Sequence, residues 1–397
     1  MKRKILAATF SIAAGACLAF ALASCGKEGT VELQFKLNEE TDTYTAYIDH
    51  MGTTSGKLEI PAVYNDKPVT ALGYDSYYSY FEIEIKSIVL PDSVTEINAE
   101  VFERCVDVKK VVVSENNPVY HSKGNCLIET ETNKLVFARK KSVIPDDVKA
   151  IGDYAFVKCS ALKSITLPDG VTAIGEYAFK DCDKLTSITL PSGVTSIGDY
   201  AFAGCYALAS IDLPDDLVSS GNHAFDFCEI TSVSIPAGET SIGSQTFYTC
   251  KKIESITVSQ ENAVYHSTSN CLIETETNKL VLGCMNSVIP DEVTAIGDYA
   301  FAACVGLEKI VIPAYVTSIG YGAFEGCLAL KSVEFGISVT RIENHAFGNC
   351  DSLTAINYRG TTTDWKEIKK GERWRWRSIF LTSVVCSDGT LTEDDID

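Results

Sequence analysis

The sequence predicts an α/β repeat solenoid with coils of about 23 residues, each a strand, a turn and a short helix. The hexapeptide IGDYAF occurs three times, at Ile151–Phe156, Ile197–Phe202 and Ile296–Phe301. A Phe-x-x-Cys pattern recurs every 22 or 23 residues within two runs. Two longer intervals hold inserts that match each other, and we expect these to be β-hairpins. A catalytic site is assembled once from unlike residues, so identical repetition indicates stacked structural units.

The chain begins with the pattern of a secreted lipoprotein. In residues 1–24, three basic residues precede a largely apolar run, which is typical of a signal peptide. The tetrad LASC ends at Cys25 and matches a bacterial lipobox. We therefore predict that Cys25 is lipidated, and that the exported protein is held at the cell surface or outer membrane by this anchor alone. An ordinary cleavage site with a chance cysteine is the alternative. Residues 25–30 would then be a short tether.

Residues 31–85 differ from the repeat and predict an N-terminal cap. Their first part alternates apolar and polar residues, which is typical of strands. The stretch LEIPAVYNDKPVTAL then resembles a degenerate coil. Because a solenoid exposes its apolar core at each end, such terminal units must depart from the repeat.

The regular solenoid is expected over residues 86–357, and Leu162–Lys184 shows one unit clearly. Its segment SITL alternates polar and apolar residues and predicts a strand. Pro-Asp-Gly predicts a turn, and Gly175 a tight corner. Ala178, Phe179 and the residues that follow have apolar spacing typical of a short helix. One unit of this size cannot close a core, so neighbouring coils must share one.

Most of the fifteen cysteines belong to this repeat. Equivalent residues on stacked coils would lie about 4.8 Å apart, close enough for a disulfide, but their side chains would point in the same direction. We therefore predict a ladder of reduced, buried thiols, with disulfides or a metal site as the alternatives. The sequence has no Cys-x-x-Cys pair, which gives zinc little support. The repeat cysteines are Cys105, Cys159, Cys182, Cys205, Cys228, Cys250, Cys304, Cys327 and Cys350.

The inserts cover residues 114–148 and 259–293 and are offset by 145 residues. Each contains NCLIETETNKLV, in which two apolar segments flank a short polar turn. This pattern predicts a β-hairpin in each insert. The constant offset indicates that a block of several coils was duplicated as one piece.

Residues 358–397 depart from the repeat again and predict a C-terminal cap followed by an acidic tail. The segment RWRWR is aromatic and basic, whereas the last six residues, TEDDID, are mostly acidic. We expect the tail to be disordered.

Composition and motifs argue against several function classes. The formal charge of −19 disfavours nucleic acid as a partner. The five histidines occur singly, and the sequence lacks zinc-protease, nucleophile-elbow, phosphate-loop and calcium-loop motifs. We therefore predict no catalytic residues, no metal site and no cofactor.

The repeat, the insert VYHS…NCLIETETNKLV and the ending Y-x-G-T…W…V-x-C-x-D-G resemble the BspA-type leucine-rich repeat family. The resemblance covers roughly residues 31–390. It implies a leucine-rich-repeat solenoid in a secreted or surface-attached bacterial protein, and binding of host matrix proteins or other cells. It implies no catalytic residues.

Binding is the function that a solenoid favours, because stacking creates a long sheet surface. We predict that protein partners, such as host matrix or cell-surface proteins, bind the polar ladder that alternates with the buried strand positions. This face is small and polar, and Ser and Thr also suit a solvated strand without any binding role. The predicted binding residues are Thr166, Thr189, Asp212, Ser234, Thr257, Glu334 and Asn357.

A second candidate patch is Trp374, Arg375 and Trp376, which would attract anionic glycans by charge and stacking if exposed. The competing interpretation, which we favour, is that these tryptophans cap the apolar core. The Tyr-rich stretch Tyr74–Tyr80 is a third candidate contact surface. Glycan capture by an accessory lipoprotein and a purely structural envelope role remain the alternatives to protein binding.

Overall fold

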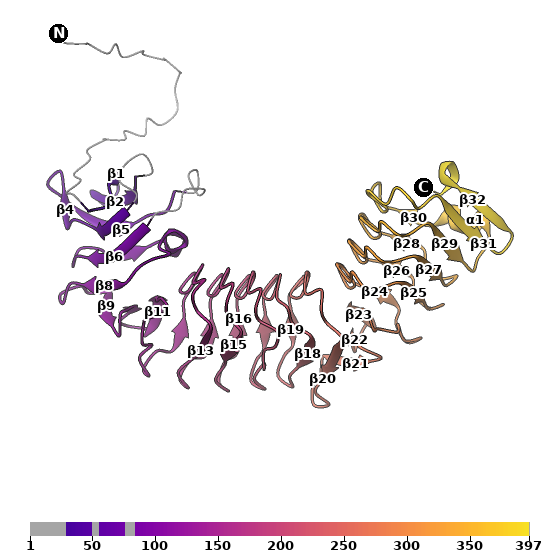
Figure 1. Cartoon of the computed structure of the whole chain (residues 1–397), viewed down its shortest axis with the longest axis horizontal. Coiled ribbons are helices and arrows are strands. Elements are labelled where there is room, and N and C mark those ends of the chain that lie inside the picture. The colour runs from indigo at the N-terminus through magenta and orange to yellow at the C-terminus, as the bar shows by residue number, and fades with distance from the viewer. Residues whose placement is uncertain (1–28, 50–54, 76–83, 397) are drawn as a thin grey trace, which may run out of the picture.

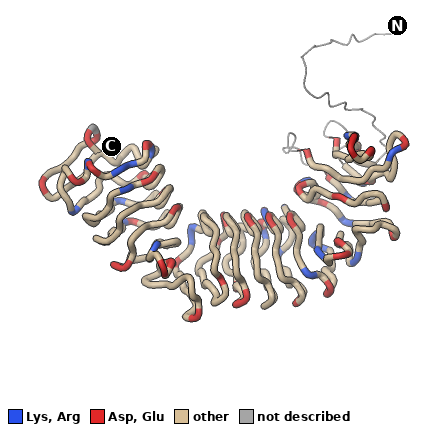
Figure 2. Tube along the Cα trace, turned by 180° about the vertical axis from the view of Figure 1, so that it is seen from behind, with Lys and Arg blue, Asp and Glu red and all other residues tan. Residues whose placement is uncertain are grey.

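A computed structural model describes residues 29–49, 55–75 and 84–396. The chain forms a long curved β-solenoid whose coils stack from the N-terminal cap, indigo in Figure 1, to the C-terminal cap, yellow. Cys25, the signal peptide and most of Tyr74–Tyr80 lie outside the described residues. Figure 2 shows acidic and basic positions interspersed along the arc rather than separated at its two ends.

The predicted SITL strands form the first side of the solenoid, where neighbouring coils pair in parallel. Their alternation of polar and apolar residues buries one face and exposes the other. The ladder is interrupted at residues 208–213, which form no strand, and at both inserts. It comprises β3 (Ser55–Glu59), β6 (Glu84–Leu90), β8 (Lys110–Val113), β13 (Ser164–Thr166), β15 (Ser187–Thr189), β18 (Ser232–Ile235), β20 (Ser255–Val258), β25 (Lys309–Ile312), β27 (Ser332–Phe335), β29 (Ala355–Tyr358) and β31 (Ser383–Cys386).

The second side is a ladder of strands only two residues long, which the sequence analysis did not predict. In most of them the second residue, usually isoleucine, is buried in the core. These strands are β7 (Glu96–Ile97), β12 (Ala150–Ile151), β14 (Ala173–Ile174), β16 (Ser196–Ile197), β17 (Ser219–Ser220), β19 (Ser241–Ile242), β24 (Ala295–Ile296), β26 (Ser318–Ile319), β28 (Arg341–Ile342) and β30 (Lys369–Lys370).

The third side contains consecutive turns, so the expected short helix in each coil is wrong. Tyr177 and Asp181 have φ of 55° and 58°, in the left-handed region, and this breaks a helix every four residues. The N–H of Phe179 donates to the carbonyl of Ala201 in the next coil at 2.7 Å instead of closing a helical bond. Among the residues of this side that the structure describes, only the coil that begins at β6 has a helix, the 3₁₀-helix η2 (Ala99–Arg104).

The invariant glycine of IGDYAF serves close packing rather than a special backbone angle. A Cβ atom on Gly198 would lie 2.7 Å from backbone atoms of Gly175 and Glu176 in the preceding coil. The aspartate of the motif also acts between coils, because Asp153 Oδ1 accepts the N–H of Glu176 at 2.8 Å. The repeated hexapeptide thus encodes the contact between successive coils.

The core contains a stack of phenylalanine rings, as the repeat predicts. Phe179 and Phe202 have parallel rings with centroids 5.2 Å apart. The thiols line up beside them, and Cys205 Sγ donates to the carbonyl oxygen of Phe179 at 3.3 Å. The thirteen described cysteines are free, and all but Cys304 are buried. Burial raises the pKa of the Cys105 thiol to about 12.

Each insert contains the expected hairpin and one further strand. In the first, β10 (Cys126–Glu129) and β11 (Lys134–Phe137) pair antiparallel, and β9 (Tyr120–Lys123) extends the sheet. β11 then pairs in parallel with β12, so the hairpin continues the second side of the solenoid. The second insert repeats this arrangement with β21 (Tyr265–Thr268), β22 (Cys271–Glu274) and β23 (Lys279–Leu282).

The N-terminal end of the core is covered by a small sheet. The hairpin of β1 (Leu33–Asn38) and β2 (Thr43–Ile48) packs at the end of the coils. β2 pairs with β5 (Lys67–Leu72), which continues through β7 into the second side. β5 also pairs with β4 (Val63–Tyr64).

The C-terminal end is closed by helix α1 (Thr362–Glu367) and strand β32 (Gly389–Thr392). Trp365 of α1 is fully buried. The prediction of a disordered tail is wrong, because η3 (Glu393–Asp395) packs against α1. The indole N–H of Trp365 donates to the carbonyl of Ile396, which is itself buried, and Lys366 pairs with Asp395 at 3.0 Å.

Candidate binding surface

The predicted polar ladder is present on the first side in short segments. Thr166 lies opposite Thr189, and Ser234 lies opposite Thr257, each pair on adjacent parallel strands. All four side chains are exposed. Their hydroxyl groups therefore form rows that a partner could reach from solvent.

Two predicted members of the ladder differ from the others. Asp212 is exposed but lies in the irregular segment between β15 and β18, so it interrupts the paired ladder. Glu334 and Asn357 are in register, yet the Glu334 carboxylate already accepts the guanidinium N–H of Arg359 at 2.7 Å. The predicted surface is thus less uniform than the repeat suggests.

Exposed aromatic residues border this ladder, and the sequence analysis missed them. Tyr206 and Phe227 lie in the turns that lead into the strand positions of two neighbouring coils, and their ring centroids are 6.3 Å apart. Their exposed fractions are 54% and 48%. Each is the only aromatic residue at its position of the repeat, a departure that could have identified both. Large exposed rings are the side chains that protein interfaces use as anchors.

The three residues of the second candidate patch differ in how deeply they are buried. Trp374 is only 2% exposed and packs edge-on against Trp365. It therefore caps the core and does not belong to the candidate binding patch. Arg375 is half-buried and donates to the carbonyl of Leu381 at 3.1 Å. Trp376 is partly exposed, with the Arg377 guanidinium 4.4 Å from its ring centroid.

Trp376 lines an open groove of about 300 Å³ at the C-terminal cap. Arg373, Arg375 and Arg377 contribute positive charge to it, and Glu372 and Glu393 oppose them. Two neighbouring apolar side chains are strongly exposed, Ile379 at 69% and Phe380 at 55%.

A ladder of tyrosine and histidine rings runs along the third side, but the rings cover each other. Tyr177 and Tyr200 are stacked with centroids 5.0 Å apart, and His223 continues the stack at 4.6 Å. Because the ring faces are in contact, only the edges could meet a ligand. The ladder therefore contributes mainly to cohesion between coils.

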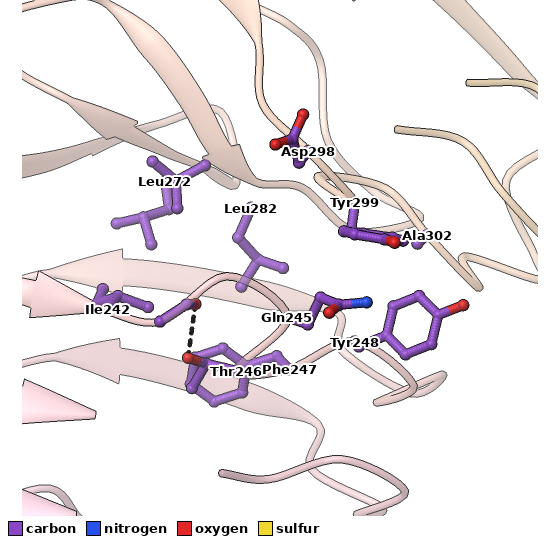
Figure 3. Close-up of a pocket in the computed structure, with 12 residues that line it drawn as sticks. Ile242, Gln245, Thr246, Phe247, Tyr248, Leu272, Leu282, Asp298, Tyr299 and Ala302 are labelled. Carbon is purple, nitrogen blue, oxygen red and sulfur yellow. Dashed lines mark hydrogen bonds between the residues drawn. The ribbon is translucent and has the colours of Figure 1, made fainter. Parts of the chain in front are cut away.

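Parallel stacking is lost where the second insert begins. Tyr248 meets Tyr299 edge-on, at 5.2 Å and 82°. Figure 3 shows the cavity at this point, of about 30 Å³, with Thr246 hydrogen-bonded to the carbonyl of Gly243. That volume holds about one water molecule and no substrate.

Polar groups of catalytic type are dispersed in the part of the chain that the structure describes. His223 contacts the buried Asp226 at 3.1 Å, and His266 contacts Thr275 at 3.0 Å at an exposed position of a different coil. No group of three His, Cys, Asp or Glu among the described residues could hold a metal ion. In the same residues, no helix has the length and apolarity needed to cross a membrane.

Comparison with known structures finds bacterial leucine-rich repeat proteins. A leucine-rich cell surface protein of Faecalibacterium prausnitzii is 24% identical, with 88% of this chain and 98% of that chain covered and a TM-score of 0.49. A leucine-rich repeat protein of Bacteroides ovatus is 21% identical, with 92% and 94% covered and a TM-score of 0.44. One of Eubacterium ventriosum is 22% identical, with 68% and 82% covered and a TM-score of 0.46.

No curated protein matches the sequence. The family model of the BspA type leucine-rich repeat region, with six copies, matches residues 70–139, 128–254, 172–286 and 273–370. These matches together span most of the solenoid, including both inserts. The chain therefore belongs to the family of BspA-type leucine-rich repeat proteins.

Proposed function

We propose that this chain is a non-catalytic lipoprotein, exported and anchored through Cys25, that binds protein partners at the cell surface. The partners would be matrix or surface proteins of a host or of other cells. The family supports a binding role for the repeat, and the lipobox at Cys25 supports the anchor.

The observation that carries the proposal is the exposed ladder of Thr166, Thr189, Ser234 and Thr257, bordered by exposed aromatic rings. Hydroxyl rows can form many weak hydrogen bonds with a protein surface, and the rings would supply buried apolar contact. Each contact is modest, so display of many copies on a cell would increase the apparent affinity.

An array of immobilised matrix proteins and glycans, probed with soluble Gly26–Asp397, tests the proposal. We expect saturable binding to a protein that survives moderate salt. The Thr166→Lys, Thr189→Lys variant should weaken it about tenfold or more, since two long charged chains would obstruct the ladder.

The matched control is Thr172→Lys, Thr195→Lys, which places the same charges on exposed threonines of the same two coils but away from the strand ladder. Equal loss in both variants, or no retained protein at all, would contradict binding through the ladder. The second outcome would favour a purely structural envelope role.

Glycan capture is the second candidate function, and the groove beside Trp376 favours it. Arginines and a partly exposed indole suit an anionic sugar. If glycans occupy this groove, Trp376→Ala should abolish binding to glycan spots and leave protein spots unchanged. Trp374→Ala is unsuitable as a test, because that side chain supports the cap.

The anchor is tested separately with the full chain. Metabolic labelling with a fatty acid should mark the wild-type protein and not Cys25→Ala. Labelling that persists in the variant would refute lipidation at this residue.

A further inference from the structure

A basic pocket lies where the first insert rejoins the solenoid. Its volume is about 200 Å³, and Arg139, Lys140, Lys141 and Lys109 line it with a single acidic residue, Asp107. Four positive charges against one negative charge are unusual in a chain with a net charge of −19.

Arg139 is the buried member of this group, with 6% of its surface exposed. Its Nε donates to the carbonyl of Cys105 at 2.8 Å, its Nη2 to that of Phe102 at 3.1 Å, and its Nη1 to that of Ala138 at 3.2 Å. A guanidinium has five N–H donors, so two remain for another acceptor. The guanidinium carbon also lies 4.3 Å from the Phe137 ring centroid.

The charge of Arg139 is not matched by a carboxylate. The Asp107 carboxylate pairs with Lys109, with 3.4 Å between Oδ2 and Nζ. Among the described residues, no ion pair is formed by Arg139, Lys140 or Lys141. A buried charge held only by neutral groups, here carbonyl dipoles and an aromatic ring, carries a large desolvation cost. An anion in the pocket would offset that cost.

Packing alone explains part of this arrangement. In regular coils a thiol satisfies the phenylalanine carbonyl of the preceding coil, as Cys182 Sγ does for Phe156 at 3.2 Å. Arg139 performs this role for Phe102. That role accounts for the buried guanidinium, but it does not account for the two adjacent lysines at the rim.

The duplicated block supplies an internal comparison. At the offset of 145 residues, Arg139 becomes Cys284, Lys140 becomes Met285, Lys141 becomes Asn286 and Lys109 becomes Glu254. The second junction keeps the same fold without these charges, so the fold does not require them.

We propose that this pocket binds a tetrahedral oxyanion, a sulfate or phosphate group, against the free N–H donors of Arg139 with Lys140 and Lys141 closing over it. Such a dianion accepts several charge-assisted hydrogen bonds at once. The site lies at the turns that precede β8 and β13, and it does not depend on the protein-binding function proposed above.

Isothermal titration calorimetry tests the site. Soluble Gly26–Asp397 is titrated with sodium sulfate or sodium phosphate, and sodium chloride at equal ionic strength is the control titrant. We expect saturable binding in the millimolar range. Lys140→Gln with Lys141→Gln should weaken it about tenfold, because both side chains are exposed and the fold should be retained. Lys163→Gln with Lys184→Gln removes the same charge from exposed sites and should have no effect.

Absence of binding above the chloride baseline, or equal weakening in the two double variants, would overturn the proposal. Crystals soaked in selenate should show anomalous density beside Arg139, and density only elsewhere would also overturn it. A sulfated disaccharide that binds more tightly than inorganic sulfate would identify a glycan as the source of the anion. Equal affinity would identify the free oxyanion.

Discussion

Glu239 occupies a position in the core that adjacent coils fill with an apolar side chain. The equivalent residues Val171, Val194 and Leu217 are fully buried, and so is Glu239. Neither oxygen of its carboxyl group has a hydrogen-bond partner among the described residues. Glu239→Val restores the side chain of the repeat, and we expect it to stabilise the protein.

The size and pH dependence of this effect follow from the burial. Desolvation raises the pKa of Glu239 to about 7 from the ordinary value of 4.5. The difference corresponds to about 3 kcal/mol. Between these values the folded state binds more protons than the unfolded state. The wild-type free energy of unfolding should therefore fall as pH rises from about 4.5 to about 7 and then level off.

Urea unfolding followed by far-ultraviolet circular dichroism at about pH 4.5, 6 and 8 measures this directly. The variant should gain about 3 kcal/mol over wild type at pH 8 relative to pH 4.5. Glu261→Gln, at an exposed turn, serves as the control and should show no such trend. A gain that is constant with pH, or a loss of stability in Glu239→Val, would refute the burial of a neutral carboxyl group.

Three further predictions concern the repeat and its end. Gly198→Ala should destabilise the protein by several kcal/mol in urea titrations. The control Gly193→Ala, whose Cβ would meet nothing within 4 Å, should be neutral or slightly stabilising. Equal effects of the two variants would contradict the close contact between coils. Alkylation should modify the thirteen cysteines of Gly26–Asp397 only after unfolding, since they are nearly all buried, and rapid native labelling would contradict this. Deletion of residues 393–397 should shift Trp365 fluorescence to the red; an unchanged spectrum would show that the tail does not pack.

The repeat was sufficient to predict the stacked coils because its apolar positions must share a core. It did not predict the third side, where the spacing of Phe179 and Cys182 fits both a helix and a series of turns. In some coils the residue before the cysteine carried part of the missing signal, whereas Lys158, Phe227 and Ala303 adopt the same conformation without signalling it. Asp181, Gly204 and Asn349 are residue types that tolerate the left-handed conformation observed there.

The candidate surface was predicted less completely than the fold. Period-two alternation identified exposed Thr166 and Thr189, but alternation cannot show that a strand is interrupted, as at Asp212. Trp374 and Trp376 differ in burial although they are two residues apart, because α1 covers only the end of the core. Such differences depend on the three-dimensional position of the cap, which a single sequence does not specify.

Hydroxyl-radical footprinting tests binding through the strand ladder most directly. Gly26–Asp397 is oxidised alone and in complex with the protein that bound it on the array. Tyr206 and Phe227 border the ladder, Trp376 lines the C-terminal groove, and the exposed Phe380 follows the lining residue Ile379 in the chain. Binding through the ladder predicts that oxidation falls at Tyr206 and Phe227 and is unchanged at Trp376 and Phe380. Protection confined to the second pair would contradict that account and place the partner at the C-terminal cap.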